Sequence, residues 1–475
     1  MAHVVRLAFA LLSFALCLSG CETRAARAPG ADAATSLRTV AIGLCEDYPE
    51  ESRSLAEVRR DFAVLKAAGL DLLRVSIGWD EVEPQKDRYD FAFWDQFVDI
   101  AVKEHKIRLL PYVAYTPRWN SDGAPEDFWK TPPRDAREFG ELMRLLSERY
   151  RGRVHSWELW NEPDNRDYWL GSSAEYATLL EVGSLGVRSG DAGAQVVFGG
   201  LAGGVEFLRQ LFDEHRAAER VDVVNLHSYY ETWNENPVET IPEYVDEVTA
   251  IVKRHGGRQT LWMAEFGYSD FLPDNQRKAH FGYEHSLEFQ AVMLVRALAL
   301  ALSKPELSLL AWYELKDARA SDAVIGDAHN RHLGVTFADY RPKPAFDALV
   351  FMNRLVAPGF RSVDSELTVA AKANSALVWR AFLSARRSVV FTAWLQTHPK
   401  PAAAGHGSEP NDARRERVRV RLPYKARGPA RAYDARGRPR DASVSLRRFG
   451  HATELSFELA AGDVSVVELP VKLPE

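Results

Sequence analysis

The chain has 475 residues, of which 46% are hydrophobic and 27% charged, a composition typical of a folded globular protein of more than one domain. Its formal net charge of -6 does not favour general binding to nucleic acid. The sequence has neither a glycine-rich phosphate loop nor a Cys/His cluster at metal-ligand spacing, so we expect no cofactor and no metal.

Residues 1–20 are predicted to be a signal segment. Arg6 gives a positive start, and the apolar run at 7–18 is too short to span a bilayer comfortably. The run ends in Leu18-Ser19-Gly20-Cys21, which resembles the lipobox of bacterial lipoproteins. The resemblance implies cleavage before Cys21, its lipidation, and a lipid anchor in a membrane of the bacterial cell envelope. The alternative is an ordinary secretory signal with a chance cysteine.

Residues 21–37 are rich in alanine and lack periodicity, which is typical of a flexible tether. If Cys17 leaves with the signal and Cys21 carries lipid, Cys45 remains alone, which rules out an intramolecular disulfide. We expect Cys45 to be a small buried residue near the end of a first strand rather than a reactive thiol.

The segment 38–357 alternates short apolar runs with segments of helical periodicity. This pattern predicts an α/β fold, a TIM (β/α)8 barrel. A doubly wound open sheet is the main alternative, but the first run is not followed by a glycine fingerprint. The runs expected as strands are 38–44, 70–77, 107–113, 154–160, 195–200, 221–227, 260–266 and 307–315.

The segment 358–475 alternates polar and apolar residues at period two, which predicts an antiparallel β-sandwich domain. Its last part, 453–471, is interpreted as two strands across a Gly-Asp turn. Arginine alternates with valine in "RVRVRL" (417–422), so the arginines should mark a solvent-facing side of a strand. Binding of an anionic polysaccharide or lipid headgroup is the alternative reading of that face.

Two glutamates follow or end predicted strands where a TIM barrel places its catalytic residues. Glu162 follows the fourth strand, in "HSWELWNEPD", and Glu265 ends the seventh. Two carboxylates that face each other across the top of a barrel are what glycoside hydrolysis requires, one to donate a proton and one to attack or to activate water. The alternative is that both are structural.

Several motifs resemble clan A glycoside hydrolases, and most closely family 39 and related bacterial exopolysaccharide hydrolases. They are "WNEP" and "AEFG" at the two glutamates, "LLRVSIGWDEVEPQKDRYDF" (72–91), "LLPYVAYTPRWNS" (109–121), "HSYY" (227–230) and "RPKPAFDAL" (341–349). The resemblance covers about 38–357. It implies a retaining hydrolase, with Glu162 as acid/base and Glu265 as nucleophile. With the predicted membrane anchor, the leading hypothesis is a glycosidase that acts on an extracellular or periplasmic polysaccharide. Tyr115 stands where family 5 enzymes of this clan usually have a histidine, which disfavours a cellulase-type enzyme.

Further residues are expected to serve the two glutamates. The clan places an arginine such as Arg74 near the nucleophile, Tyr229 is expected to orient Glu265, and Asn161 to bond the sugar 2-hydroxyl. Trp157 and Trp160 are expected to desolvate Glu162 and so raise its pKa. The predicted substrate-binding set is Arg74, Asn161, His227, Tyr229, Trp312, Trp119 and Trp160, with Trp129 and Trp233 as further loop aromatics.

The alternatives for this set are structural. Arg74 is alternatively a structural ion-pair partner, His227 a core histidine and Trp312 a core residue. Glu158 and Glu314 are not predicted to be catalytic; Glu314 is expected near the rim, paired at most with an arginine or lysine. For the whole chain, the alternatives are a noncatalytic carbohydrate-binding lipoprotein and a transglycosylase. The sugar and its linkage are not indicated by the sequence.

Overall fold

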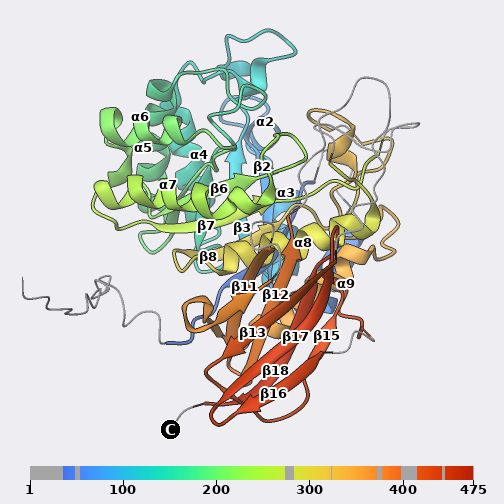
Figure 1. Ribbon diagram of the computed structural model, residues 1–475. Coiled ribbons are helices and arrows are strands. Elements are labelled where there is room, and N and C mark those ends of the chain that lie inside the picture. Colours follow the sequence, from blue (N-terminus) through green and yellow to red (C-terminus); the bar gives the residue numbers. More distant parts are fainter. Residues whose placement is uncertain are drawn as a thin grey trace, which may run out of the picture. The chain divides into compact units, whose positions relative to one another are not determined.

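Eight parallel strands close into a barrel in the described part of the chain (Figure 1). The computed structural model describes residues 36–48, 54–272, 283–322, 324–371, 377–396, 415–440 and 444–473. The strands follow one another round the barrel in chain order, and β8 pairs with β1, so the predicted TIM barrel is confirmed. The strands are β1 Ala41–Glu46, β2 Leu72–Gly78, β3 Arg108–Ala114, β4 Ser156–Leu159, β5 Gln195–Phe198, β6 Val223–Ser228, β7 Thr260–Phe266 and β8 Leu307–Trp312.

Helices alternate with these strands, and their apolar sides pack on the barrel in one continuous core. Local sequence sets where the helices begin: Ser172 and Glu175, for example, form a reciprocal capping box at the start of α5. The helices are α1 Leu55–Ala67, α2 Trp79–Val82, α3 Ala92–Asp99, α4 Ala136–Arg149, α5 Ser173–Gly190, α6 Val205–His215, α7 Ile241–Arg254, α8 Leu287–Leu302 and α9 Pro344–Val356.

The inside of the barrel has an apolar lower part and a polar layer toward the carboxyl ends of the strands. The apolar cluster includes Leu72, Val197 and Cys45, which is buried as predicted and donates its thiol to the Ala264 carbonyl at 3.2 Å. Arg74 and Glu158 are buried among the polar side chains above. Polar groups inside a barrel require partners, so this layer marks where the chemistry is concentrated.

The C-terminal region forms two antiparallel sheets, consistent with the predicted β-sandwich. One sheet has the order β10-β13-β17-β16 and the other β14-β18-β12-β11-β9, with β15 paired to β18. β17 and β18 lie in different sheets, so the Gly-Asp turn links the two sheets instead of closing a hairpin. The strands are β9 Phe360–Ser362, β10 Thr368–Ala370, β11 Leu377–Ser384, β12 Ser388–Leu395, β13 Arg415–Leu422, β14 Lys425–Ala426, β15 Arg431–Tyr433, β16 Ser445–Phe449, β17 Ala452–Ala460 and β18 Ser465–Lys472.

Strand β13 has the predicted alternation, with arginines exposed and Val418, Val420 and Leu422 buried between the sheets. The sheet that contains β12 turns its other face to the barrel, and Phe382, Val390 and Trp394 join the barrel's own core cluster. The sandwich is therefore packed on the barrel by apolar side chains.

Polar contacts fix the same interface. The Trp394 indole donates to Glu239 Oε1 at 2.6 Å, in the connection between β6 and α7. Arg296, buried in α8, donates to the Asp463 carbonyl at 3.2 Å. Residues 37–475 form one compact unit.

The described residues include no helix long and apolar enough to cross a membrane. Cys21 and the predicted signal and tether lie outside the described residues, apart from the last residues of the tether.

Candidate active site

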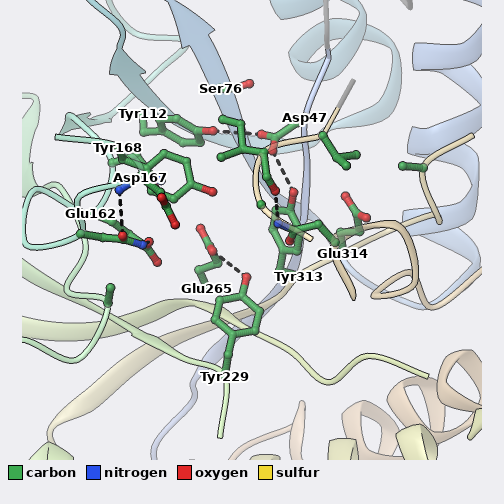
Figure 2. Close-up of a pocket in the computed structure, with 18 of the residues that line it drawn as sticks. Asp47, Ser76, Tyr112, Glu162, Asp167, Tyr168, Tyr229, Glu265, Tyr313 and Glu314 are labelled. Atoms are coloured by element: carbon green, nitrogen blue, oxygen red, sulfur yellow. Dashed lines mark hydrogen bonds between the residues drawn. The ribbon is translucent and has the colours of Figure 1, made fainter. Parts of the chain in front are cut away.

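A cavity of about 630 Å³ opens at the carboxyl ends of the barrel strands (Figure 2). Glu162 and Glu265 both line it. One potential ligand oxygen of each carboxylate lies within 4.8 Å of the other. The two glutamates singled out by their positions after β4 and in β7 are therefore brought together in one cavity.

Glu162 is held by an unusual stretch of backbone beyond β4. Trp160 and Glu162 have φ angles of 80° and 44°, in the left-handed region that side chains other than glycine seldom adopt. The Glu162 amide donates to the Gly199 carbonyl at 2.6 Å, and Asn165 Nδ2 donates to Glu162 Oε2 at 2.8 Å. The residue is 5% exposed, and burial raises the pKa of its carboxyl to about 7. A carboxyl with this pKa can both deliver and accept a proton near neutral pH.

Glu265 receives two strong donors. Arg74 Nη1 donates to Oε2 at 2.6 Å, and the Tyr229 hydroxyl donates to Oε1 at 2.6 Å. Burial raises the pKa of Glu265, while the Arg74 cation and the Tyr229 hydrogen bond oppose that rise. Among the described residues, a guanidinium donates to Glu265 and none donates to Glu162, so the charged form is favoured more directly at Glu265.

Arg74 joins three polar side chains at the top of the barrel. Besides Glu265, it contacts both oxygens of Glu158, at 2.8 and 3.1 Å, and donates to Asn161 Oδ1 at 2.9 Å. Arg74 is thus both a structural ion-pair partner and a neighbour of the predicted nucleophile. Glu158 is engaged by this pair and does not line the cavity.

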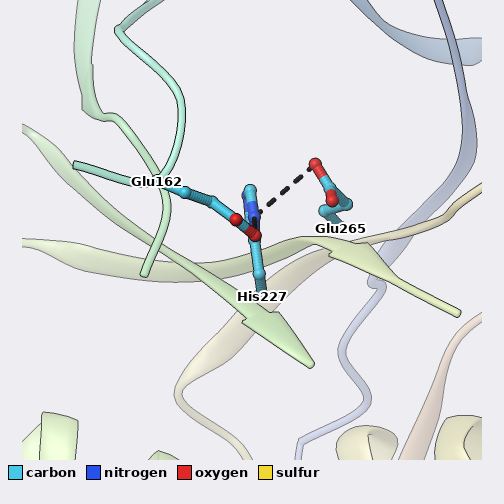
Figure 3. Close-up of side chains that lie close together, drawn as sticks. All are labelled: Glu162, His227 and Glu265. Atoms are coloured by element: carbon cyan, nitrogen blue, oxygen red, sulfur yellow. Dashed lines mark hydrogen bonds and ion pairs between the residues drawn. The ribbon is translucent and has the colours of Figure 1, made fainter. Parts of the chain in front are cut away.

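His227 bridges the two glutamates from below (Figure 3). Its Nδ1 lies 2.8 Å from Glu162 Oε1 and 3.5 Å from Glu265 Oε2. Asn225 determines the proton's place on the ring. The Ala264 amide donates to Asn225 Oδ1 at 2.8 Å, which turns the Asn225 amide nitrogen toward His227 Nε2 at 3.3 Å. Nε2 accepts this hydrogen bond, so a neutral ring carries its proton on Nδ1 and donates it to Glu162.

The imidazole is kept neutral and tightly confined. Burial lowers the pKa of His227. Gly200, at the end of β5 with φ 68°, faces the ring so closely that a Cβ there would lie 2.2 Å from Nε2. Only glycine leaves room for the histidine.

Glu162, His227 and Glu265 are also a group of potential metal ligands among the described residues, since one ligand atom of each lies within 4.8 Å of the others. Their actual partners disfavour this use. Arg74 already supplies a cation at 2.6 Å from Glu265, and a second cation beside it would be repelled. The donor set therefore suits proton transfer better than metal binding.

The predicted aromatic contacts are only partly present. Contrary to the prediction, Trp160, Trp312 and Trp119 do not line the cavity. Trp160 packs on Trp169 with ring centroids 4.9 Å apart, Trp312 packs on Phe266, and the Trp119 indole donates to the Glu83 carbonyl.

The structure also shows which of the other tryptophans lie at the cavity. Trp157 stacks on Tyr150 of the helical layer, so it does not desolvate Glu162 from the cavity side. Trp129 packs on Tyr115, which itself lines the cavity. Trp233 lines the cavity beside Tyr229, with ring centroids 4.7 Å apart.

Glu314 differs from its expected role. It is buried, lines the cavity, and its Oε1 has no hydrogen-bond partner in the described part of the chain, instead of pairing with an arginine or lysine at the rim. Sequence reasoning also missed Asp47, Tyr112, Asn165 and Asn225. The polar pair Glu46-Asp47 at the end of the first strand was the available signal for one wall of the cavity.

Comparison with known proteins identifies the family. The family model for glycosyl hydrolases family 39 matches residues 35–383. A solved family 39 glycoside hydrolase from Bacteroides cellulosilyticus WH2 superposes with a TM-score of 0.65 at 19% identity, covering 92% of this chain and 81% of that one. A monomeric β-xylosidase from Caulobacter crescentus CB15 superposes with a TM-score of 0.63 at 16% identity, covering 91% and 96%.

A curated relative, the β-galactosidase BbgII of Bifidobacterium bifidum, is 29% identical over a segment that covers 22% of this chain and 18% of that protein. The match therefore spans less than a fifth of that relative's length. The family model covers most of the chain. The chain therefore belongs to family 39 of the glycosyl hydrolases and is a glycosidase that acts on a carbohydrate.

Proposed function

We propose that the protein is a retaining β-glycosidase that cleaves an extracellular or periplasmic polysaccharide by double displacement, with Glu162 as acid/base and Glu265 as nucleophile. The observation that carries the proposal is the separation of the two carboxylates, which have oxygens within 4.8 Å of each other. Inverting enzymes hold their carboxyls about 6.5–9.5 Å apart to admit a water between them, and retaining enzymes about 5–5.5 Å.

In the first step, Glu265 attacks the anomeric carbon while the bond to the leaving oxygen breaks. Glu162, protonated near neutral pH because of its raised pKa of about 7, gives its proton to that oxygen. An ester then joins the sugar to Glu265, which is no longer charged. Of the two carboxylates that pair with Arg74, only Glu158 keeps its negative charge at this stage. This pair keeps the guanidinium satisfied during the covalent stage.

In the second step, Glu162 is a carboxylate and takes a proton from water, which attacks the same carbon and releases Glu265. The Nδ1–H of His227 and the amide of Asn165 both donate to Glu162 and stabilise this charged form. Asn161 lines the cavity, and its oxygen is occupied by Arg74, so its amide nitrogen is the group that meets the sugar 2-hydroxyl.

Two variants test these roles. Glu265→Ala should abolish turnover on every substrate because no ester can form. Glu162→Ala should retain the first step on nitrophenyl glycosides, whose leaving group needs no proton, and azide should restore turnover as the retained glycosyl azide. Glu214, exposed on α6, gives a matched control, since Glu214→Ala should be as active as wild type.

The stereochemistry of the product decides the mechanism independently. Proton NMR during hydrolysis should show the retained anomer first. An inverted first product, or wild-type activity in either glutamate variant, contradicts the proposal.

We also propose that the enzyme is held at a membrane of the cell envelope by lipid on Cys21. The support is the sequence Leu18-Ser19-Gly20-Cys21 after a short apolar run. Mass spectrometry of the native N-terminus should find diacyl- or triacyl-modified Cys21, and Cys21→Ser should move the protein to the soluble fraction. An unmodified Cys21 rejects the anchor and leaves the glycosidase proposal intact.

A further inference from the structure

One wall of the active-site cavity is built where β1 and β8 end side by side. Asp47 follows β1, and its two oxygens accept hydrogen bonds from Tyr112 at 3.1 Å and from Tyr313 at 3.0 Å. Glu46, beside it, is bound by Lys316 at 2.7 Å. Tyr313 and Glu314 follow β8 directly, so both strand ends bring an acidic residue to the same wall.

Glu314 is the unsatisfied member of this wall. It is 5% exposed, it lines the cavity, and its Oε1 has no hydrogen-bond partner among the residues that the structure describes. The neighbouring cation, Lys316, donates to Glu46 and Asp61 instead. A buried carboxyl without a partner is costly, and such a group in a binding cavity is commonly completed by the ligand.

The rest of the cavity is also lined by acidic groups. Nine acidic side chains line it, and none of the described lining residues is a lysine, arginine or histidine. Beyond the two catalytic glutamates and the wall just described, Asp167 and Asp322 are among them. Like charges in a hollow of low dielectric create a potential that attracts cations and repels anions.

The wall lies on the glycone side of the scissile bond. In Figure 2, Glu265 lies between Glu162 on one side and Asp47, Tyr313 and Glu314 on the other. The acid/base must stand next to the leaving oxygen, so the leaving group is on the Glu162 side. The sugar that is transferred to Glu265, or the next one toward the non-reducing end, then faces Asp47 and Glu314.

We propose that Asp47 and Glu314 form a subsite for the protonated amino group of an amino sugar, so that the substrate is a glycan with free amines on the glycone side. The inference rests on the proposed glycosidase function. It specifies the substrate class through a contact that neutral sugars do not make. Asp47, oriented by two tyrosines, would accept a hydrogen bond from the ammonium. The ammonium would also donate to Glu314 and so give its Oε1 the missing partner.

Other occupants fit less well. A bare divalent cation requires several ligand atoms close together, but Asp47, Glu314 and their described neighbours do not form a group of three within 4.8 Å. A neutral hydroxyl would bring no positive charge to the carboxyls of Asp47 and Glu314. Burial, with Glu46, Asp47 and Asp317, raises the pKa of Glu314 well above its ordinary range. An ammonium reverses part of that rise, so binding should release a proton from Glu314 to solvent.

The test measures binding without turnover. Calorimetry is performed on the full-length protein with thio-linked disaccharides of glucosamine, N-acetylglucosamine and glucose, and with the matching galactose series, because sulfur linkages resist hydrolysis. In one of the two series, the amine should bind at least about tenfold more tightly than its acetylated and hydroxyl counterparts at pH 7, and added salt should weaken it. The heat should vary with the ionisation enthalpy of the buffer for the amine alone.

Variants assign the preference to the wall. Asp47→Asn and Glu314→Gln should each reduce amine binding by about tenfold while neutral sugars change less than about twofold. Glu314→Gln should also remove the buffer dependence, and the exposed control Glu214→Gln should change neither quantity. Equal or tighter binding of the neutral sugars in both series, or an amine preference that survives both variants, rejects the subsite. A separate screen for hydrolysis judges the glycosidase proposal: cleavage of neutral glycans without amine preference rejects the subsite alone, and amine binding without cleavage of any glycan rejects hydrolysis alone.

Discussion

The Nδ1 atom of His227 lies 2.8 Å from Oε1 of Glu162, so a buried imidazole donates directly to the carboxyl proposed as acid/base. The direction of this hydrogen bond is set by Asn225, whose side-chain amide donates to the other ring nitrogen, Nε2. The contact favours the charged form of Glu162 and opposes the effect of burial. The pKa of Glu162 thus depends on two opposing effects: burial, which raises it, and the hydrogen bond from His227, which lowers it.

Two substitutions of His227 separate its hydrogen bond from its bulk. His227→Phe removes the donor and should raise the pKa of Glu162, moving the alkaline limb of the pH–rate profile upward and lowering kcat by about ten- to hundredfold. His227→Asn can keep a donor near the Nδ1 position and should restore most of kcat. Identical profiles in the two variants contradict the positioning role.

The pH dependence of kcat/KM should be a narrow bell. Glu162 must be protonated in the first step, and its pKa of about 7 means that activity falls as the pH rises through 7. Glu265 must be ionised, and its raised pKa places the acid limb above the ordinary value for glutamate. Rate measurements between pH 4 and 9 on a poor leaving group check both limbs. With a nitrophenyl leaving group the alkaline limb should weaken, and a limb that does not depend on the leaving group disagrees with Glu162 as acid.

Breaking the Arg74 pairs should strongly destabilise the fold. Arg74→Met leaves Glu158 buried without its cation, a change that costs about 3–5 kcal/mol of unfolding free energy. Arg74→Lys keeps the positive charge but not the bidentate guanidinium, so its unfolding free energy should fall by less than that of Arg74→Met. Urea unfolding provides the measurement, and Arg59→Met, in the exposed pair with Glu104, should change stability far less because water and salt screen that pair. Equal losses at Arg74 and Arg59 contradict the importance of burial.

Two tryptophans predicted to serve the same purpose should behave differently. Trp233 lines the cavity, so Trp233→Ala should raise KM about three- to tenfold with little loss of stability. Trp312 is buried against Phe266, so Trp312→Ala should cost about 3–5 kcal/mol of stability. Steady-state kinetics and thermal unfolding of both variants distinguish the roles. A rise in KM for Trp312→Ala without destabilisation contradicts this assignment.

The barrel was predictable because its evidence is local and repeated. Each parallel strand is buried on both faces, so its sequence is a short run of apolar residues. The eight predicted runs coincide with β1 to β8, with small differences at their ends. The two glutamates follow from the rule that barrel chemistry gathers at carboxyl ends of strands. The family motifs around "WNEP" and "AEFG" reinforced that rule.

The aromatic residues were not predictable to the same degree. Whether a side chain at a strand end faces the cavity or the helices depends on the register of neighbouring strands, and β7 and β8 pair with irregular shifts. Trp312 therefore packs against Phe266, and the next residue, Tyr313, faces the cavity. The partners of Arg74 and Glu314 likewise depend on residues far away in the chain, which no local pattern reveals.

The bond between Trp394 and Glu239 limits how this enzyme can be engineered. Glu239 belongs to the connection after β6, which also carries Tyr229, the donor to Glu265, and Trp233, in the cavity wall. The sandwich thus braces the same loop that shapes the active site. Exchanging this sandwich for that of a relative would alter specificity along with solubility, so a chimera must keep the two parts as a matched pair.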